Sequence, residues 1–170
     1  RTLRRFGNPT ATRVIAQCGA EPEYFLTDRA VYEQRKDLIF TGRTLFGAKP
    51  PKGQELEDHY FCPIKPRVSA FMKELDEELW RYGILAKTKH NEVAPAQHEL
   101  APLFTTTHPA ADGNPLTTEV SRQVAAQHPL VHLLHEKHSV RVNGTGTHTK
   151  QSRSPPRLTL PHTRTNPPET

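Results

Sequence analysis

The chain has 170 residues, of which 34% are apolar, and adding the 9 glycines gives roughly 39%, below the ~45–50% usual for a soluble globular domain. No run approaches the ~18–20 apolar residues of a membrane helix and no signal peptide is recognisable, so we expect no membrane partner and a cytoplasmic location. The net charge is +5, but the residues from Lys150 onward carry +3 of it, so the charge of the preceding residues is nearly balanced. The sequence also lacks zinc-finger spacing, and we therefore expect no nucleic-acid partner.

Residues 13–27 predict two extended segments joined by a bend. β-branched and aromatic residues stand on both sides of the sequence Gly-Ala-Glu-Pro at 19–22, which contains a proline. Glu21 and Glu23 are two positions apart, so on a strand both carboxylates would project from the same face.

A short helix is expected at 29–38, and a long loop at 41–61 follows it. The loop contains glycines, prolines and aromatic residues without periodicity, which is typical of functional loops and of loops packed down by their own side chains. The clearest helix is predicted at 66–82, because Pro66 suits a first turn, apolar residues recur at helical spacing and Gly83 can cap the end.

A hairpin and a second helix are predicted next. Strands at about 84–93 and 97–104 flank the sequence Ala-Pro-Ala, which favours a turn. The helix is expected at 114–127, with Asn114 as its N-terminal cap and Pro115 in its first turn.

The last part of the chain contains one further strand and a tail. The strand is expected from Val131, and the sequence Asn-Gly-Thr-Gly at 143–146 predicts a turn or loop. Between Gln151 and Thr170, five of 20 residues are proline and none is aromatic, so burial cannot offset the entropy of ordering this segment. We expect this tail to be disordered.

Four carboxylates are candidate metal ligands, Glu21 and Glu23 on one strand and Glu92 and Glu99 on the two arms of the hairpin. Glu92 and Glu99 would lie on opposite faces of a continuous strand, and a turn at Pro95 lets them converge. Inward-pointing glutamates must be neutralised, and Mg²⁺ or Mn²⁺ usually does so. From spacing alone, solvated surface glutamates are the commoner arrangement.

The histidines do not form a recognisable zinc motif. His132, His135 and His138 repeat every three residues, which fits neither a strand face nor the His-Glu-x-x-His pattern, so surface or packed imidazoles are the commoner interpretation. His148 differs because it ends the glycine-rich sequence VNGTGTH at 142–148, whose backbone N–H groups could approach an anion or a carboxylate.

Taken together, these segments resemble the catalytic region of glutamine synthetases of the type III class. The similarity runs from about Phe6 to Ser152, in the family's order and approximate spacing. The segments that carry it are GAEPEYFLTD (19–28), TGRTLFGAKPPKGQELEDHYF (41–61), KHNEVAPAQHELAP (89–102), HEK (135–137) and VNGTGTH (142–148).

The resemblance implies an α+β fold in which a curved, mainly antiparallel sheet carries the carboxylates on its concave face and helices pack on the outside. It also implies ATP-dependent ligation of ammonia to glutamate through γ-glutamyl phosphate, with Mg²⁺ or Mn²⁺ as the cofactor. The implied partners are glutamate, ammonia, ATP and, in the full-length family, further copies of the same chain.

The resemblance assigns the candidate ligands to two metal sites. Glu23, Glu92 and Glu99 match the carboxylates of the site nearest glutamate. Glu21 and His148 match ligands of the site nearest the ATP phosphates.

Other matches concern the substrates. Asn143 and Gly144 fall where the family's loop holds glutamate, and Ser152 falls near a nucleotide contact. Lys150 is a departure, because many members carry histidine or asparagine close to this position to help with the nucleotide.

We therefore expect residues 1–152 to be part of a glutamine synthetase catalytic domain and 153–170 to be a proline-rich tail read out of frame. The family's phosphate-binding arginines and N-terminal domain have no counterpart in the sequence, so we do not expect full activity from this chain alone. Two alternatives stay open: a non-catalytic remnant that binds divalent metal or associates with full-length subunits, and a ligase that joins glutamate to another amine.

Overall fold

A computed structural model describes residues 2–154, apart from the side chains of residues 87 and 88. Within this range a six-stranded antiparallel sheet is combined with helices, which confirms the expected α+β class. The strands are β1 (Ile15–Asp28), β2 (Ala86–Asn91), β3 (Gln97–Pro102), β4 (Thr105–Thr106), β5 (Leu130–Leu133) and β6 (Thr147–Ser154). The helices are α1 (Thr2–Arg5), α2 (Arg29–Tyr32), α3 (Lys36–Thr41), the 3₁₀ turn η1 (Glu55–Glu57), α4 (Asp58–Phe61), α5 (Pro66–Arg81) and α6 (Thr107–Gln127).

The first strand is continuous, so the predicted bend at 19–22 is wrong. β1 runs through Pro22, which occupies the last register position opposite β6. The pairing with β3 begins at the next residue, Glu23. Pro22, which has no N–H, therefore lies where the pairing of β1 changes from β6 to β3. A strand tolerates proline at such a position.

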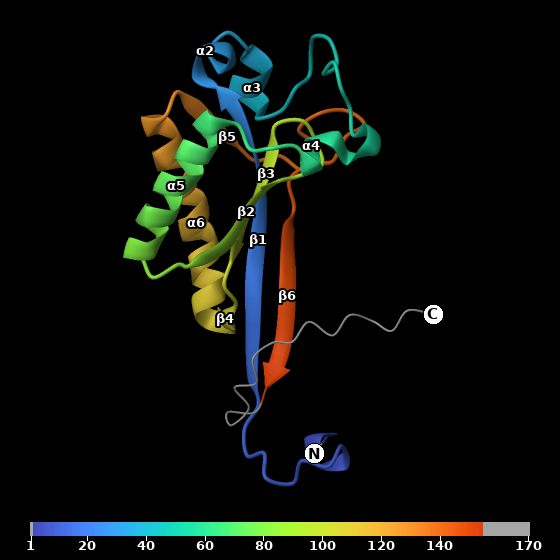
Figure 1. Cartoon of the computed structure of the whole chain (residues 1–170), viewed down its shortest axis with the longest axis vertical. Helices are drawn as coiled ribbons and strands as arrows, with labels where there is room; N and C mark the ends of the chain where they lie inside the picture. The colour runs from blue at the N-terminus through green and yellow to red at the C-terminus, as the bar shows by residue number, and fades with distance from the viewer. Residues whose placement is uncertain (1, 155–170) are drawn as a thin grey trace.

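β1 is the centre of the sheet because all but one of the other strands pair with it. Phe25 is paired with both β3 and β5, whereas Gln17 and Cys18 are paired with both β4 and β6. β2 joins through β3 as the predicted hairpin. Figure 1 shows β6 running alongside the long β1 strand, with α5 and α6 together on one side of the sheet.

The helix predicted at 66–82 is confirmed as α5. Its buried face consists of Val68, Phe71, Met72, Leu75 and Leu79, at the spacing expected of an amphipathic helix. Beyond its end, Gly83 has a φ of 75°, the left-handed conformation that glycine adopts most readily.

The start of the second long helix was predicted wrongly. α6 begins at Thr107, not at Asn114, and Pro115 lies inside it. The proline in the first turn is Pro109, where the missing N–H costs nothing because that N–H has no partner within the helix.

Several shorter predictions are refined. The helix expected at 29–38 is split into α2 and α3, and the loop 41–61 contains η1 and α4. The strand expected from Val131 is β5, and 143–146 contains no strand or helix. Of the predicted tail, Gln151–Ser154 belong to β6, which corrects the expectation of disorder for these residues, while 155–170 lie outside the described residues.

The main core lies between the sheet and the two long helices. Tyr24 and Leu26 of β1 pack with Phe71 and Leu75 of α5 and with Val124 of α6. No helix among the described residues is long and apolar enough to cross a membrane.

His132 of β5 is a polar residue within this core. Its ring stacks on Tyr24 with centroids 4.8 Å apart, and its Nδ1 atom has no hydrogen-bond partner within the described part of the chain. Burial, together with the charge of Arg122, lowers the pKa of His132 from 6.5 to about 3. The imidazole is therefore neutral in the folded chain at pH values where the unfolded chain would protonate it.

The substitution His132→Phe tests this consequence. Between pH 6.5 and 3 the unfolded state binds a proton that the folded state does not, so the free energy of unfolding falls on acidification. We expect His132 to account for a loss of about 2 kcal/mol between pH 7 and pH 5, and phenylalanine to abolish that part. Urea denaturation at pH 7 and pH 5 measures the free energy of unfolding, and His108→Phe, at an exposed histidine, is the control. An equal loss of stability between the two pH values in wild type and in His132→Phe would contradict the expectation.

Candidate metal centre

Three buried glutamates converge where β1 and β3 pair. Glu23 is directly opposite Glu99 in the antiparallel register, and Glu21 lies two residues before Glu23 on β1. Their exposed fractions are only 8% for Glu21, 6% for Glu23 and 5% for Glu99. The burial argues against the alternative of solvated surface glutamates and calls for neutralisation of their charge.

Glu99 binds two histidines, one with each carboxylate oxygen. Its Oε1 atom is 2.9 Å from Nδ1 of His148, and its Oε2 atom is 2.9 Å from Nε2 of His90. His148, the second residue of β6, is opposite Glu21, whereas His90 on β2 is opposite Glu99. The carboxylate therefore connects residues from three strands.

Two groups of three side chains could each hold a metal ion. The Glu21 group consists of Glu21, Glu99 and His148, and the Glu92 group of His90, Glu92 and Glu99. Within each group, one ligand atom per residue lies within 4.8 Å of the others. Two carboxylates and one imidazole form a donor set that suits Mn²⁺ or Mg²⁺.

The electrostatics of the site support this fit. Burial, and next the charge of Glu99, raise the pKa of Glu92, which shows that the carboxylates repel each other. The hydrogen bond to Glu99, assisted by the charges of Glu23 and Glu99, raises the pKa of His148 against the opposing effect of burial. Both shifts indicate a strongly negative site that a divalent cation would stabilise.

The position of Glu23 is fixed by neutral donors. Its Oε2 atom accepts a hydrogen bond of 3.0 Å from Nε2 of Gln97 and one of 2.9 Å from the backbone N–H of Gly146. Its Oε1 atom is 3.3 Å from Nε2 of His148. Glu23 lies beside both groups but is not part of either.

The glycine-rich loop provides this contact because it passes very close to another backbone segment. A β-carbon added to Gly144 would lie 1.7 Å from the carbonyl oxygen of Glu136, so only glycine fits. The carbonyl of Gly144 accepts a hydrogen bond of 3.1 Å from Gln97. The predicted approach of backbone N–H groups to a carboxylate thus occurs, with Glu23 as the carboxylate.

The other predicted residues lie around the loop and along β6. The backbone N–H of Asn143 donates to Oε1 of Gln54, which ties this loop to the segment 41–61. Ser152 is four residues beyond His148 on β6, so both project from the same face, and its hydroxyl is 3.4 Å from Oε1 of Gln17.

Sequence reasoning did not single out His90 or Gln97, and it noted Lys150 only as a departure. The signal for His90 was its position two residues before Glu92, which would place both on one face of the strand predicted at 84–93. In the structure β2 ends at Asn91, and Glu92 follows it directly. The contact of Lys150 with Glu21, at 2.5 Å between Nζ and Oε1, had no signal because it depends on the register of β1 with β6.

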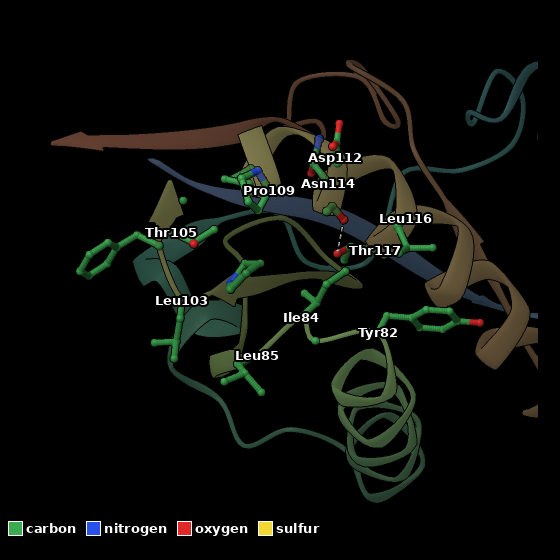
Figure 2. Close-up of a pocket in the computed structure, with 17 residues that line it drawn as sticks. Tyr82, Ile84, Leu85, Leu103, Thr105, Pro109, Asp112, Asn114, Leu116 and Thr117 are labelled. Atoms are coloured by element: carbon green, nitrogen blue, oxygen red, sulfur yellow. Dashed lines mark hydrogen bonds between the residues drawn. The ribbon is translucent and has the colours of Figure 1, made fainter. Parts of the chain in front are cut away.

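A pocket of about 520 Å³ lies elsewhere on the sheet. Figure 2 shows Ile84, Leu85 and Leu103 among the side chains that line it. None of the predicted ligand residues is among the described residues that form its walls. The pocket is therefore separate from the candidate metal centre.

The substitution Gly144→Ala tests the close approach of the loop. The added methyl group would overlap with the carbonyl of Glu136, so we expect the free energy of unfolding to fall by about 3 kcal/mol. Gly146→Ala is the matched control, because the nearest atom to its β-carbon, Oε2 of Glu23, would be at 3.5 Å. Urea denaturation compares the two variants; equal stability would show that the loop does not pack as described.

Comparisons with known proteins identify the family. The sequence model for "Glutamine synthetase, catalytic domain" matches residues 4–157. The chain is 57% identical over 150 residues to a protein of Butyrivibrio fibrisolvens named glutamine synthetase, covering 88% of this chain and 21% of that protein. It is 46% identical over 153 residues to a protein of Dictyostelium discoideum named type-3 glutamine synthetase, covering 90% of this chain and 21% of that protein. The chain thus spans about a fifth of the length of these relatives.

Solved structures agree on the fold. A glutamine synthetase from Plasmodium falciparum superimposes with a TM-score of 0.61 at 18% identity, over 86% of this chain and 32% of that one. The structure titled "Apo GmaS without ligand" gives a TM-score of 0.63 at 20% identity, over 84% and 31%. With the family match and the two relatives, these findings show that the chain belongs to the glutamine synthetase family and represents part of its catalytic domain.

Proposed function

We propose that the chain provides the metal-binding part of a site that joins ammonia to glutamate at the expense of ATP. The observation that carries the proposal is that Glu99 belongs to both three-residue groups. A carboxylate shared in this way can hold two divalent cations close together, the arrangement used to clamp a phosphoryl group during transfer.

The ligands in this proposal are Glu21, Glu23, Glu92, Glu99 and His148, with His90 added by the geometry. Bound Mg²⁺ or Mn²⁺ would supply positive charge between two anionic reactants, ATP and the γ-carboxylate of glutamate. The protein's part is to fix the carboxylates before the reactants arrive: Gln97 and Gly146 hold Glu23, and the register of β1 with β3 holds Glu99.

The proposed reaction has two steps. An oxygen of the γ-carboxylate attacks the γ-phosphorus of ATP, and ADP leaves. Ammonia then attacks the acyl carbon, inorganic phosphate leaves and the nitrogen gives up a proton. Positioning and charge neutralisation account for most of the catalysis of such steps.

The substrate contacts are proposed by position. Asn143 and Gly144 stand in the loop next to Glu23 and would hold glutamate, while Ser152 on β6 would contact the nucleotide. The names of the relatives support glutamine synthesis as the activity of the whole protein. We further propose that the whole protein works as a cytoplasmic homo-oligomer.

The substitution Glu99→Gln tests the shared carboxylate. Because Glu99 belongs to both groups, we expect the substitution to weaken both Mn²⁺ binding steps. The affinity of each step should fall by ~10-fold or more, since the loss of a residue that only supports a metal ligand already has an effect of that size. Glu92→Gln should weaken only one step, because Glu92 belongs to one group. Isothermal titration calorimetry measures both steps, with Glu77→Gln on α5 as the control. Equal binding by Glu99→Gln and Glu77→Gln would contradict the proposal.

A phosphate-release assay separates catalysis from metal binding alone. With ATP, glutamate, ammonia and Mn²⁺, phosphate release that requires glutamate and that disappears in Glu92→Ala would support catalysis by the chain itself. Since the chain spans only about a fifth of its relatives, a non-catalytic metal-binding role is the specific alternative. Intact Mn²⁺ binding without any phosphate release would favour that alternative.

A further inference from the structure

Lys150 is a positively charged side chain that lies beside the Glu21 group. Its Nζ atom is 2.5 Å from Oε1 of Glu21. The lysine side chain is 75% exposed, whereas that of Glu21 is only 10% exposed. A largely exposed lysine side chain on β6 therefore contacts a carboxylate that is almost fully buried.

The register of β1 with β6 explains this contact. Lys150 is two residues beyond His148, so both side chains leave the same face of β6. Directly opposite Lys150 is Gly19, which has no side chain, and directly opposite His148 is Glu21. Glu21 is thus the diagonal neighbour of Lys150, within reach of a long side chain.

The lysine acts on only one of the two groups. Glu21 belongs to the Glu21 group, and the Glu92 group does not contain it. In the described part of the chain, the ion-pair partners of Glu92 and Glu99 are the histidines His90 and His148, not a lysine or an arginine. With neutral histidines, the Glu92 group has a formal charge of −2, whereas Lys150 reduces that of the Glu21 group to −1.

We propose that Lys150 is a tethered competitor of the divalent cation at the Glu21 group. Its ammonium must leave Glu21 before an ion gains the full charge of that carboxylate, so the Glu21 group binds Mn²⁺ more weakly and fills after the Glu92 group. Affinity for a divalent cation rises with the negative charge of its ligands, which gives the direction of the effect. The inference rests on the proposed function, because it assumes that both groups bind metal.

The structure makes Lys150 suitable for displacement. An exposed lysine is a strongly hydrated charge on a flexible stem, so its ammonium can return to water when another cation reaches Glu21. An arriving divalent cation takes over the compensation of the buried Glu21 carboxylate, so release of Nζ into water does not leave that charge unpaired.

The test measures Mn²⁺ affinity by calorimetry with one group disabled at a time. His90→Ala leaves only the Glu21 group complete, and His148→Ala leaves only the Glu92 group complete. We expect Lys150→Gln to tighten binding about five-fold in the His90→Ala background and to have no effect in the His148→Ala background. Lys150→Arg keeps the charge and should keep the weak affinity.

Lys52→Gln is the matched control. It removes the same charge from an ion pair of the same length, 2.5 Å to Asp58, on a side chain that is 76% exposed. We expect this variant to leave Mn²⁺ affinity unchanged in both backgrounds. Far-ultraviolet circular dichroism verifies that each variant is folded. If His90→Ala or His148→Ala does not fold, Lys150→Gln is made in the wild-type chain. Its two-step Mn²⁺ titration must then show tighter binding in the weaker step only.

The possible outcomes separate the two proposals. An equal change in both backgrounds, or a change no larger than that of Lys52→Gln, would overturn the role of Lys150 and leave the metal groups intact. Absence of Mn²⁺ binding in wild type and in all variants would reject the metal site, and the role of Lys150 with it.

Discussion

The mutual repulsion of buried glutamates determines how this part of the molecule is arranged. Glu21, Glu23 and Glu99 are each less than a tenth exposed, and a buried charge without compensation costs on the order of several kcal/mol. Several polar groups nearby reduce that cost. The imidazoles of His90 and His148 contact Glu99, amide donors hold Glu23, and an ammonium contacts Glu21. The site is thus negatively charged, and the protein groups that offset this charge are weak partners or partners that a cation can displace.

The same strand that presents these carboxylates also forms the core. In β1 the side chains alternate, so Tyr24 and Leu26 pack against the helices while Glu21 and Glu23 face the other way. All six residues from Glu21 to Leu26 are buried. A one-residue shift in register would exchange the two sets and would destroy core and site together. Packing against α5 and α6 therefore fixes the distances between the carboxylates as well as the stability of the sheet.

Local patterns predicted the local elements, whereas the site depended on pairing between distant strands. The spacing of Phe71 and Leu75 was sufficient to predict α5. The start of α6 was predicted wrongly, because Pro115 resembled a first-turn proline although the helix begins at Thr107. Glu21 and Glu99 were recognised because a sheet must neutralise inward carboxylates. The contacts of His90 with Glu99 and of Gln97 with Glu23 were not, because cross-strand register is not visible in the separate segments.

The pairing of β1 with β6 also determines when the site can form during folding. Glu21 and His148 are partners in the register although more than 120 residues separate them along the chain. Closing so long a loop is entropically expensive, and sheets built from distant segments fold slowly. On a ribosome, β1 is made before β6, so Glu21 cannot pair with His148 until residues 147–154 have been synthesised. The Glu21 group, which needs residues of both strands, therefore forms only when the long-range pairing of β1 with β6 is complete.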